Sequence, residues 1–108
     1  MTEINLDDFK KVQLVVAKII EVEELQGADR LWKLKIDVGS EIKQIVAGIK
    51  KYYDKEKLLG KSIVVVNKLA PAVLRGVESR GMLLAAKHEQ KLTLLTLDSE
   101  LPPGSIIG

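Results

Sequence analysis

The stretch WKLKIDVGSEIKQIVAGI, residues 32–49, decides the fold class of this chain. Along its first half, apolar and charged side chains alternate: Trp32, Leu34, Ile36 and Val38 against Lys33, Lys35 and Asp37. A period of two is typical of a half-buried β-strand. The Gly39-Ser40 pair predicts a turn, and residues 42–49 predict the strand that pairs with the first. The stretch therefore predicts an antiparallel hairpin with one face in a core.

The rest of the chain predicts more short strands and few helices. Strands are expected at 13–25 (with a bulge), 62–67, 81–86 and 91–97. Asp7 and Asp8 predict the cap of a short helix through Lys11, with Phe9 and Val12 facing inward, and Asp54 to Gly60 predicts a second one. We expect one all-β domain over residues 1–108, a five-stranded OB-fold barrel with short flanking helices. A five-stranded sandwich is the alternative.

Composition narrows the function classes. Hydrophobic residues make up 46% and charged residues 30% of the 108 residues, as in globular domains. The chain has no signal-like or bilayer-length apolar run, so no membrane partner is expected. Cysteine is absent, which excludes disulfides and thiolate metal sites and favours the cytoplasm. The single histidine, His88, is expected to be exposed in a polar turn. With no nucleophile–base pair or metal constellation, we expect no catalytic residue, no metal and no cofactor.

Basic residues are concentrated in the middle of the chain. Residues 43–80 hold nine basic and three acidic side chains, a formal charge of +6, whereas the whole chain carries +2. Such asymmetry is typical of a phosphate-facing surface, although folding can also mix the charges again. Lys33 and Lys43 are expected on the outward face of the paired strands, where OB-type barrels follow a nucleic-acid backbone. Aromatic residues are scarce; Trp32 is assigned to the core, and Tyr52 or Tyr53 could stack on a base.

The stretch LRGVESRGMLLAA, residues 74–86, predicts a glycine-hinged polar loop followed by a buried strand. Gly76 and Gly81 are suited to positive φ or to close approach of another backbone. Arg75 and Arg80 allow two interpretations. They pair with nearby acids, or they present guanidinium groups, with the Ser79 hydroxyl, to phosphates or base edges. Residue types alone leave both interpretations open.

Four stretches in order, GADRLWKLKIDVG, QIVAGIKKYY, LRGVESRGMLLAA and LPPG, resemble the tRNA-binding domain family. The resemblance runs from about Asp7 to Gly104. Members are OB-fold modules of methionyl-tRNA synthetases, at the C-terminus or as a β subunit. Others are free-standing dimeric tRNA-binding proteins, CsaA chaperone relatives and cytokine-like synthetase cofactors.

The resemblance implies a module that binds tRNA mainly by shape and phosphate contacts and raises the tRNA affinity of a methionyl-tRNA synthetase, without aminoacylating by itself. The expected partners are tRNA, the synthetase and a second copy of the chain, joined through Ile4–Leu6 and Ile106-Ile107. The expected nucleic-acid contacts are Lys33, Lys43, Lys68, Arg75, Ser79, Arg80 and Met82. The family often has two basic residues where this chain has Ala72 and Val73. Two alternatives are a chaperone- or cytokine-like module for protein interaction and a general single-strand binder.

Overall fold

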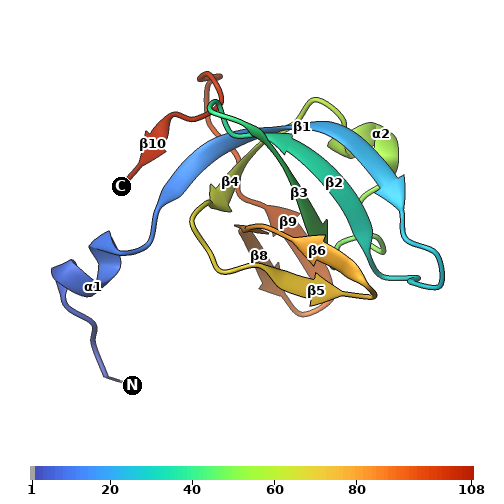
Figure 1. The fold of residues 1–108 in the computed structure, drawn as a ribbon, viewed down its shortest axis with the longest axis horizontal. Coiled ribbons are helices and arrows are strands. Elements are labelled where there is room, and N and C mark those ends of the chain that lie inside the picture. The colour runs from blue at the N-terminus through green and yellow to red at the C-terminus, as the bar shows by residue number, and fades with distance from the viewer. Residues whose placement is uncertain (1) are drawn as a thin grey trace.

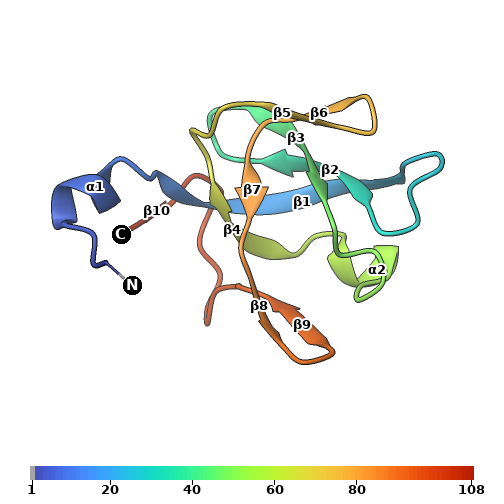
Figure 2. The same ribbon diagram turned by 90° about the horizontal axis from the view of Figure 1, so that it is seen from below.

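The computed structural model describes residues 2–108 as a strongly curved antiparallel sheet that wraps into a barrel (Figures 1 and 2). Its strands are β1 (Leu14–Glu24), β2 (Trp32–Asp37), β3 (Ile42–Ala47), β4 (Ser62–Val66) and β7 (Met82–Leu83). They follow one another in the order β3–β2–β1–β4–β7, and the free edge of β3 meets the segment just before β7. This nearly closed five-stranded barrel confirms the predicted OB fold.

Branched aliphatic side chains fill the barrel. β1 is central, because its first half pairs with β4 and its second half with β2. A register shift between Ile19 and Glu21 confirms the predicted bulge and keeps Val22 buried. The largest fully buried side chains are Ile19, Leu34, Ile36, Ile45, Leu58, Ile63, Val16 and Val65. Each such burial stabilises the fold by about 1.5–3 kcal/mol, and Trp32 joins this core as predicted.

The helix α2 (Lys55–Leu58) covers one end of the barrel (Figure 1). Its only buried residue, Leu58, inserts into the core. Asp54 occupies the N-cap position, as predicted, but its side chain makes no capping hydrogen bond. Gly60 follows with a φ of +83° and returns the chain to β4.

The helix α1 (Leu6–Lys10) stands away from the barrel, beside the C-terminal strand (Figures 1 and 2). The cap is Asn5, whose Oδ1 accepts a hydrogen bond from the Asp8 N–H at 2.8 Å. The expectation that Phe9 and Val12 face inward is wrong, since they are 40% and 44% exposed. The helix has no barrel core to face, because it lies outside the barrel, ahead of β1 in the chain. No helix in residues 2–108 has the length and apolarity needed to cross a bilayer.

Two hairpins lie outside the barrel sheet: β5 (Ala72–Leu74) with β6 (Val77–Ser79), and β8 (Ala85–His88) with β9 (Lys91–Leu94). The predicted loop at 74–82 is thus largely a hairpin. The continuous buried strand predicted at 81–86 is also wrong. At Leu84 the chain passes from β7 to β8, with hydrogen bonds to Val64 and Leu95, and the next two alanines are exposed.

The C-terminal residues complete the sheet in a way that the sequence pattern did not predict. The strand β10 (Ile106–Ile107) pairs with the start of β1. Just before it, Gly104 packs against Gly39 of the β2–β3 turn, backbone against backbone. A Cβ on Gly39 would lie 2.7 Å from the Pro103 carbonyl oxygen, and Gly39 has a φ of +91°. Only glycine fits both constraints.

Candidate nucleic-acid interface

The Ser79-Arg80 segment closes the barrel against the free edge of β3. The Ser79 Oγ accepts a hydrogen bond from the Val46 N–H at 2.9 Å and donates one to the Gly81 carbonyl at 3.2 Å. The Arg80 N–H donates to the Gln44 carbonyl at 2.9 Å. The serine hydroxyl thus replaces a strand carbonyl and satisfies a backbone N–H that would otherwise be unpaired. Ser79 is only 5% exposed, and its hydroxyl is already engaged within the barrel.

Lys43 lies on the inner face of β3, so its predicted place on the outward face is wrong. Its cross-strand neighbour Ile36 is fully buried, and directly opposed residues share one face of a sheet. Lys43 is 8% exposed, and its Nζ donates to the Asn67 carbonyl at 3.0 Å. The physical reason is the phase of β3. Residue 43 lies two positions before buried Ile45 and points to the same face, which places the lysine stem in the core while its ammonium reaches a carbonyl at the barrel rim.

The outward lysines of β2 face glutamates of β1. Lys33 lies opposite Glu23, with 3.4 Å between Nζ and Oε2, and Lys35 lies opposite Glu21. Opposite charges across a strand pair offset one another. This face of the barrel is therefore charge-balanced, and folding does partly mix the charges that the sequence separates.

Arg75 and Gly76 form the two-residue tip of the β5–β6 hairpin, between the paired Leu74 and Val77. Their φ angles are +52° and +77°. Positive φ at both positions is the requirement of a type I′ turn, which normally carries Asn-Gly or Gly-Gly. A left-handed conformation costs a side chain such as arginine about 1–2 kcal/mol. Strain at a non-glycine residue is typical of functional positions, and Arg75 lines a hollow together with Arg30 and Asp29.

Of the seven predicted contact residues, three project freely into solvent. Lys68, Arg75 and Met82 are exposed, and neither cation forms an ion pair within residues 2–108. Arg80 is also exposed, but its guanidinium lies 3.5 Å from the carboxylate of Glu41. The structure thus separates Lys33, Lys43 and Ser79, which are held by protein groups, from the freely exposed set.

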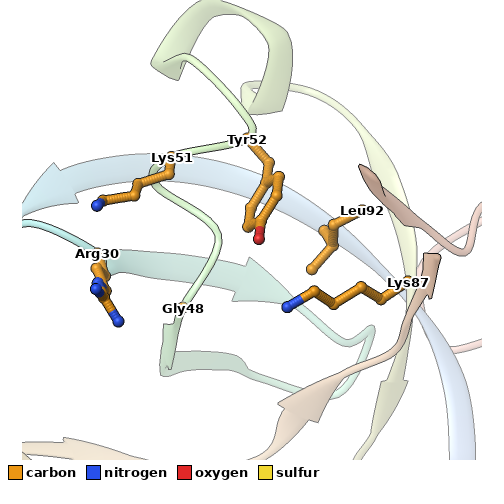
Figure 3. Close-up of a pocket in the computed structure, with 6 residues that line it drawn as sticks. All are labelled: Arg30, Gly48, Lys51, Tyr52, Lys87 and Leu92. Carbon is orange, nitrogen blue, oxygen red and sulfur yellow. The ribbon is translucent and has the colours of Figure 1, made fainter. Parts of the chain in front are cut away.

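A cleft of about 380 Å³ lies between loops of the barrel and the β8–β9 hairpin (Figure 3). We call it the basic cleft; its lining residues are Arg30, Gly48, Lys51, Tyr52, Lys87 and Leu92. They come from the β1–β2 loop, the loop after β3 and the β8–β9 hairpin. In Figure 3, Arg30 and Lys51 lie on one side of the Tyr52 ring and Lys87 on the other. No lining residue is acidic, and none of the three cations forms an ion pair in the part of the chain that is described.

Hydrogen bonds fix the three walls of the basic cleft to one another. The Lys50 N–H donates to the Arg30 carbonyl at 3.2 Å, which joins the two loops. The Tyr53 hydroxyl oxygen accepts the Leu94 N–H at 3.0 Å and joins the loop after β3 to β9. The Trp32 indole N–H donates to the Tyr53 carbonyl at 2.9 Å. The cleft is therefore largely formed before any ligand arrives.

The environment of Tyr53 shows that this ring belongs to the scaffold. The hydrogen bond with the Thr93 hydroxyl lowers the pKa of Tyr53 below its ordinary value of 10.0. The Leu94 N–H and the charges of Lys61 and Lys57 lower it further, and burial opposes them. Tyr53 is thus engaged on several sides. Tyr52, which is 38% exposed and lines the cleft, is the tyrosine that is available to a ligand.

The sequence offers Tyr52 or Tyr53 as a stacking ring and indicates Lys51 only as one of nine basic residues in 43–80. It does not indicate Arg30, Lys87 or Leu92. The three cations share one signal, because each lies next to a turn or loop: Arg30 after Gly-Ala-Asp, Lys51 before the tyrosine pair and Lys87 before the polar turn. Functional residues are common in loops that a rigid barrel positions. Their convergence depends on topology, however, and no spacing along the chain reveals it.

Comparisons with known proteins agree with this geometry. The family model described as "Putative tRNA binding domain" matches residues 14–106. The chain belongs to the tRNA-binding domain family. The matched range begins with β1 and ends at Ile106, the first residue of β10, so membership covers nearly all of the fold.

Relatives of this family member include two named "Methionine--tRNA ligase". The one from Caldanaerobacter subterraneus subsp. tengcongensis is 54% identical over 105 residues, which is 97% of this chain and 16% of that protein. The one from Thermotoga maritima is 53% identical over 105 residues, 97% of this chain and 17% of that protein. The chain therefore spans about a sixth of the length of these relatives.

Two solved structures are similar to this tRNA-binding domain over almost their whole length. A "MetRS related protein from Pyrococcus horikoshii" superposes with a TM-score of 0.94 at 35% identity, with both chains fully covered. The chaperone CsaA of Bacillus anthracis superposes with a TM-score of 0.90 at 31% identity, covering 99% of this chain and 100% of the other.

Proposed function

We propose that this chain binds folded tRNA, by its shape and through phosphate contacts, and raises the tRNA affinity of a methionyl-tRNA synthetase in the cytoplasm. The observation that carries the proposal is the basic cleft, which lies on a domain of the tRNA-binding family. Three unpaired cations around an exposed aromatic ring suit a polyanion that also presents bases. Of the side chains that line this cleft, Leu92 packs against the barrel core, whereas the three cations and Tyr52 are not part of it.

Phosphate contacts would supply most of the affinity. Arg30, Lys51 and Lys87 form no ion pair with residues 2–108, so they bind phosphate without first breaking one. Arg75 extends this set beside Arg30, from a rigid hairpin tip. An arginine at this place can bind a phosphate with two parallel hydrogen bonds.

The remaining predicted contacts divide into three groups: exposed residues, residues that hold the barrel edge, and Lys33 and Arg80, which are paired with glutamates. Lys68 and Met82 are exposed, and we retain them as contacts at the margin of the interface. Ser79 and Lys43 would act indirectly, by closing the barrel edge and its rim. Arg80 would contact phosphate only after exchanging its Glu41 partner.

The link to a synthetase rests on the relatives. The chain corresponds to about a sixth of proteins named methionine–tRNA ligase. We propose that the aminoacylation is performed by another part of such a protein or by a separate subunit. The domain would then hold tRNA close to that enzyme and increase its effective concentration.

We also propose that the chain forms a homodimer through its two ends. An apolar groove of about 370 Å³ lies between α1 and β10, lined by Leu6, Phe9, Lys10, Val12, Gln13, Leu14, Ile106, Ile107 and Gly108. The helix has five residues, none of them buried, and isolated helices of that length are unstable in water. A second copy placed on this groove would bury both elements at once.

The rival is a peptide-binding module, which the similarity to CsaA favours. Fluorescence anisotropy separates the two with three labelled ligands: a folded tRNA, an unstructured RNA of the same length and an unfolded peptide. We expect the folded tRNA to bind most tightly and its affinity to fall with salt. Tighter, salt-tolerant binding of the peptide would favour the rival, and tighter binding of the unstructured RNA would indicate a general single-strand binder.

A further inference from the structure

We propose that the basic cleft receives one unpaired nucleotide of the RNA, with its base against Tyr52 and Leu92 and its two flanking phosphates on the cations at either side. The proposal rests on the proposed function and makes it more specific. It assigns to this cleft a site where the RNA is contacted through a base as well as through its backbone.

The basic cleft contains apolar side chains as well as cations. A surface that bound phosphate alone would need only cations. Here Tyr52 is 38% exposed, and Leu92, which packs against the core and is half-buried, lies across from it in the same cleft (Figure 3). A nucleobase presents two flat apolar faces, which stack on aromatic rings with any base identity. The two side chains therefore match the base rather than the phosphate.

Positive charge lies on both sides of the Tyr52 ring. Arg30 and Lys51 lie on one side of Tyr52, and Lys87 lies on the other (Figure 3). A nucleotide within an RNA chain carries one phosphate before its sugar and one after it. Cations that flank a stacking platform therefore correspond to a single nucleotide with both of its phosphates.

The size of the basic cleft and the hydrogen bonds that join its loops also suit a single nucleotide. The cleft volume of about 380 Å³ lies within the range of roughly 300–1,000 Å³ found for small-ligand pockets. Its loops are joined by the Lys50–Arg30 and Tyr53–Leu94 hydrogen bonds, so little order has to be gained on binding. Double-stranded RNA keeps its bases stacked inside the helix, so only an extruded or loop nucleotide can enter.

The test uses the whole chain, first with small probes followed by NMR. Adenosine 3′,5′-bisphosphate carries a base and both phosphates, and inorganic phosphate and adenosine each carry one part. We expect the bisphosphate to shift the signals of Tyr52, Arg30 and Lys87 at concentrations where the two partial probes do not. Equal shifts with inorganic phosphate would overturn the nucleotide assignment, as would stronger shifts at these residues with an acidic peptide.

The second part measures tRNA affinity for Tyr52→Leu, Tyr52→Phe and the matched control Leu59→Ala. Leu59 is an exposed apolar residue outside the cleft. Loss of one stacked base weakens binding by about five- to hundredfold, and we expect this for Tyr52→Leu but not for the control. Because tyrosine is uncharged, the salt dependence of tRNA affinity should be the same for Tyr52→Leu and wild type. Tyr52→Phe keeps an aromatic ring, so it should bind tRNA nearly as tightly as wild type. Equal affinities of Tyr52→Leu and wild type would overturn this inference alone. Absence of tRNA binding by wild type would overturn the proposed function.

Discussion

At the scale of single residues, Ser79 shows how a motif side chain can serve the barrel rather than the ligand. Its hydroxyl pairs the Val46 N–H at the edge of β3 and also reaches the Gly81 carbonyl. A change at this position would therefore lower RNA affinity through the fold. If Ser79 contacts the RNA, its loss should weaken tRNA binding alone. If it closes the barrel, its loss should also lower the free energy of unfolding.

The first prediction concerns Ser79→Ala. The substitution leaves the Val46 N–H without its partner, so the free energy of unfolding should fall by about 1–3 kcal/mol. Urea denaturation measures the change, with the exposed Ser99→Ala as the matched control. Unchanged stability together with weaker tRNA binding would show that Ser79 touches the RNA directly.

Arg75 presents the opposite case, a residue whose conformation is costly to the fold. Asparagine tolerates a left-handed backbone, so Arg75→Asn should stabilise the domain by up to about 1 kcal/mol. The same change should weaken tRNA binding and reduce the salt slope by about one unit. Arg75→Lys, which keeps both charge and strain, is the control. If Arg75→Asn binds tRNA as tightly as wild type, the hairpin tip is not part of the interface.

At the scale of elements, the packing of Gly39 against Gly104 fastens β10 to the β2–β3 turn. Gly39 and Gly60 have similar φ angles of +91° and +83°. They differ in surroundings, because a Cβ on Gly39 meets the Pro103 backbone whereas one on Gly60 meets nothing within 4 Å. Substituting each glycine in turn therefore distinguishes the cost of backbone strain from the cost of steric overlap.

The corresponding prediction compares Gly39→Ala with Gly60→Ala by urea denaturation. Both variants acquire the strain of an alanine at positive φ. Only Gly39→Ala also overlaps with another backbone, and overpacking adds about 1–3 kcal/mol. Equal losses of stability in the two variants would mean that the β10 segment moves aside without cost.

Elements with one buried and one polar face are predicted correctly from the sequence, and so is the short apolar run of β4, which is buried on both faces. Alternation from Trp32 to Val38 predicts β2 because each apolar side chain meets the core. The segment 81–86 is uniformly apolar, so nothing in its pattern indicates that the chain leaves the barrel at Leu84. The charge of Lys43 favours an outward position, but its spacing from Ile45 places both side chains on the inner face of β3. The basic cleft could not be predicted, because only the closed barrel brings Arg30 and Lys87 together.

At the scale of the whole molecule, the proposed dimer interface and the proposed RNA-binding cleft lie in different places. The apolar groove is built from both chain ends, whereas the basic cleft is built from loops of the barrel. Figure 2 shows α1 and β10 at the opposite side of the molecule from α2. A dimer formed through the chain ends would therefore leave the basic cleft of each copy open to RNA.

The dimer is tested by light scattering during gel filtration. Ile106 is 76% exposed in the groove, and Ile106→Asp should convert a dimer into a monomer, because it places a charge in an apolar contact. The matched control is Ile42→Asp, at a residue that is 57% exposed on β3, away from the groove. A wild-type monomer at all concentrations, or a dimer that survives Ile106→Asp, would contradict the proposal.

The central claim is that unpaired cations of the basic cleft bind the phosphates of tRNA. The most direct measurement is the salt dependence of tRNA affinity for wild type and for a triple variant, Arg30→Gln, Lys51→Gln and Lys87→Gln. The logarithm of the association constant should fall linearly with the logarithm of salt concentration, and the slope of the triple variant should be shallower by about two to three units. An affinity that does not respond to salt, or the same slope for both proteins, would contradict the account.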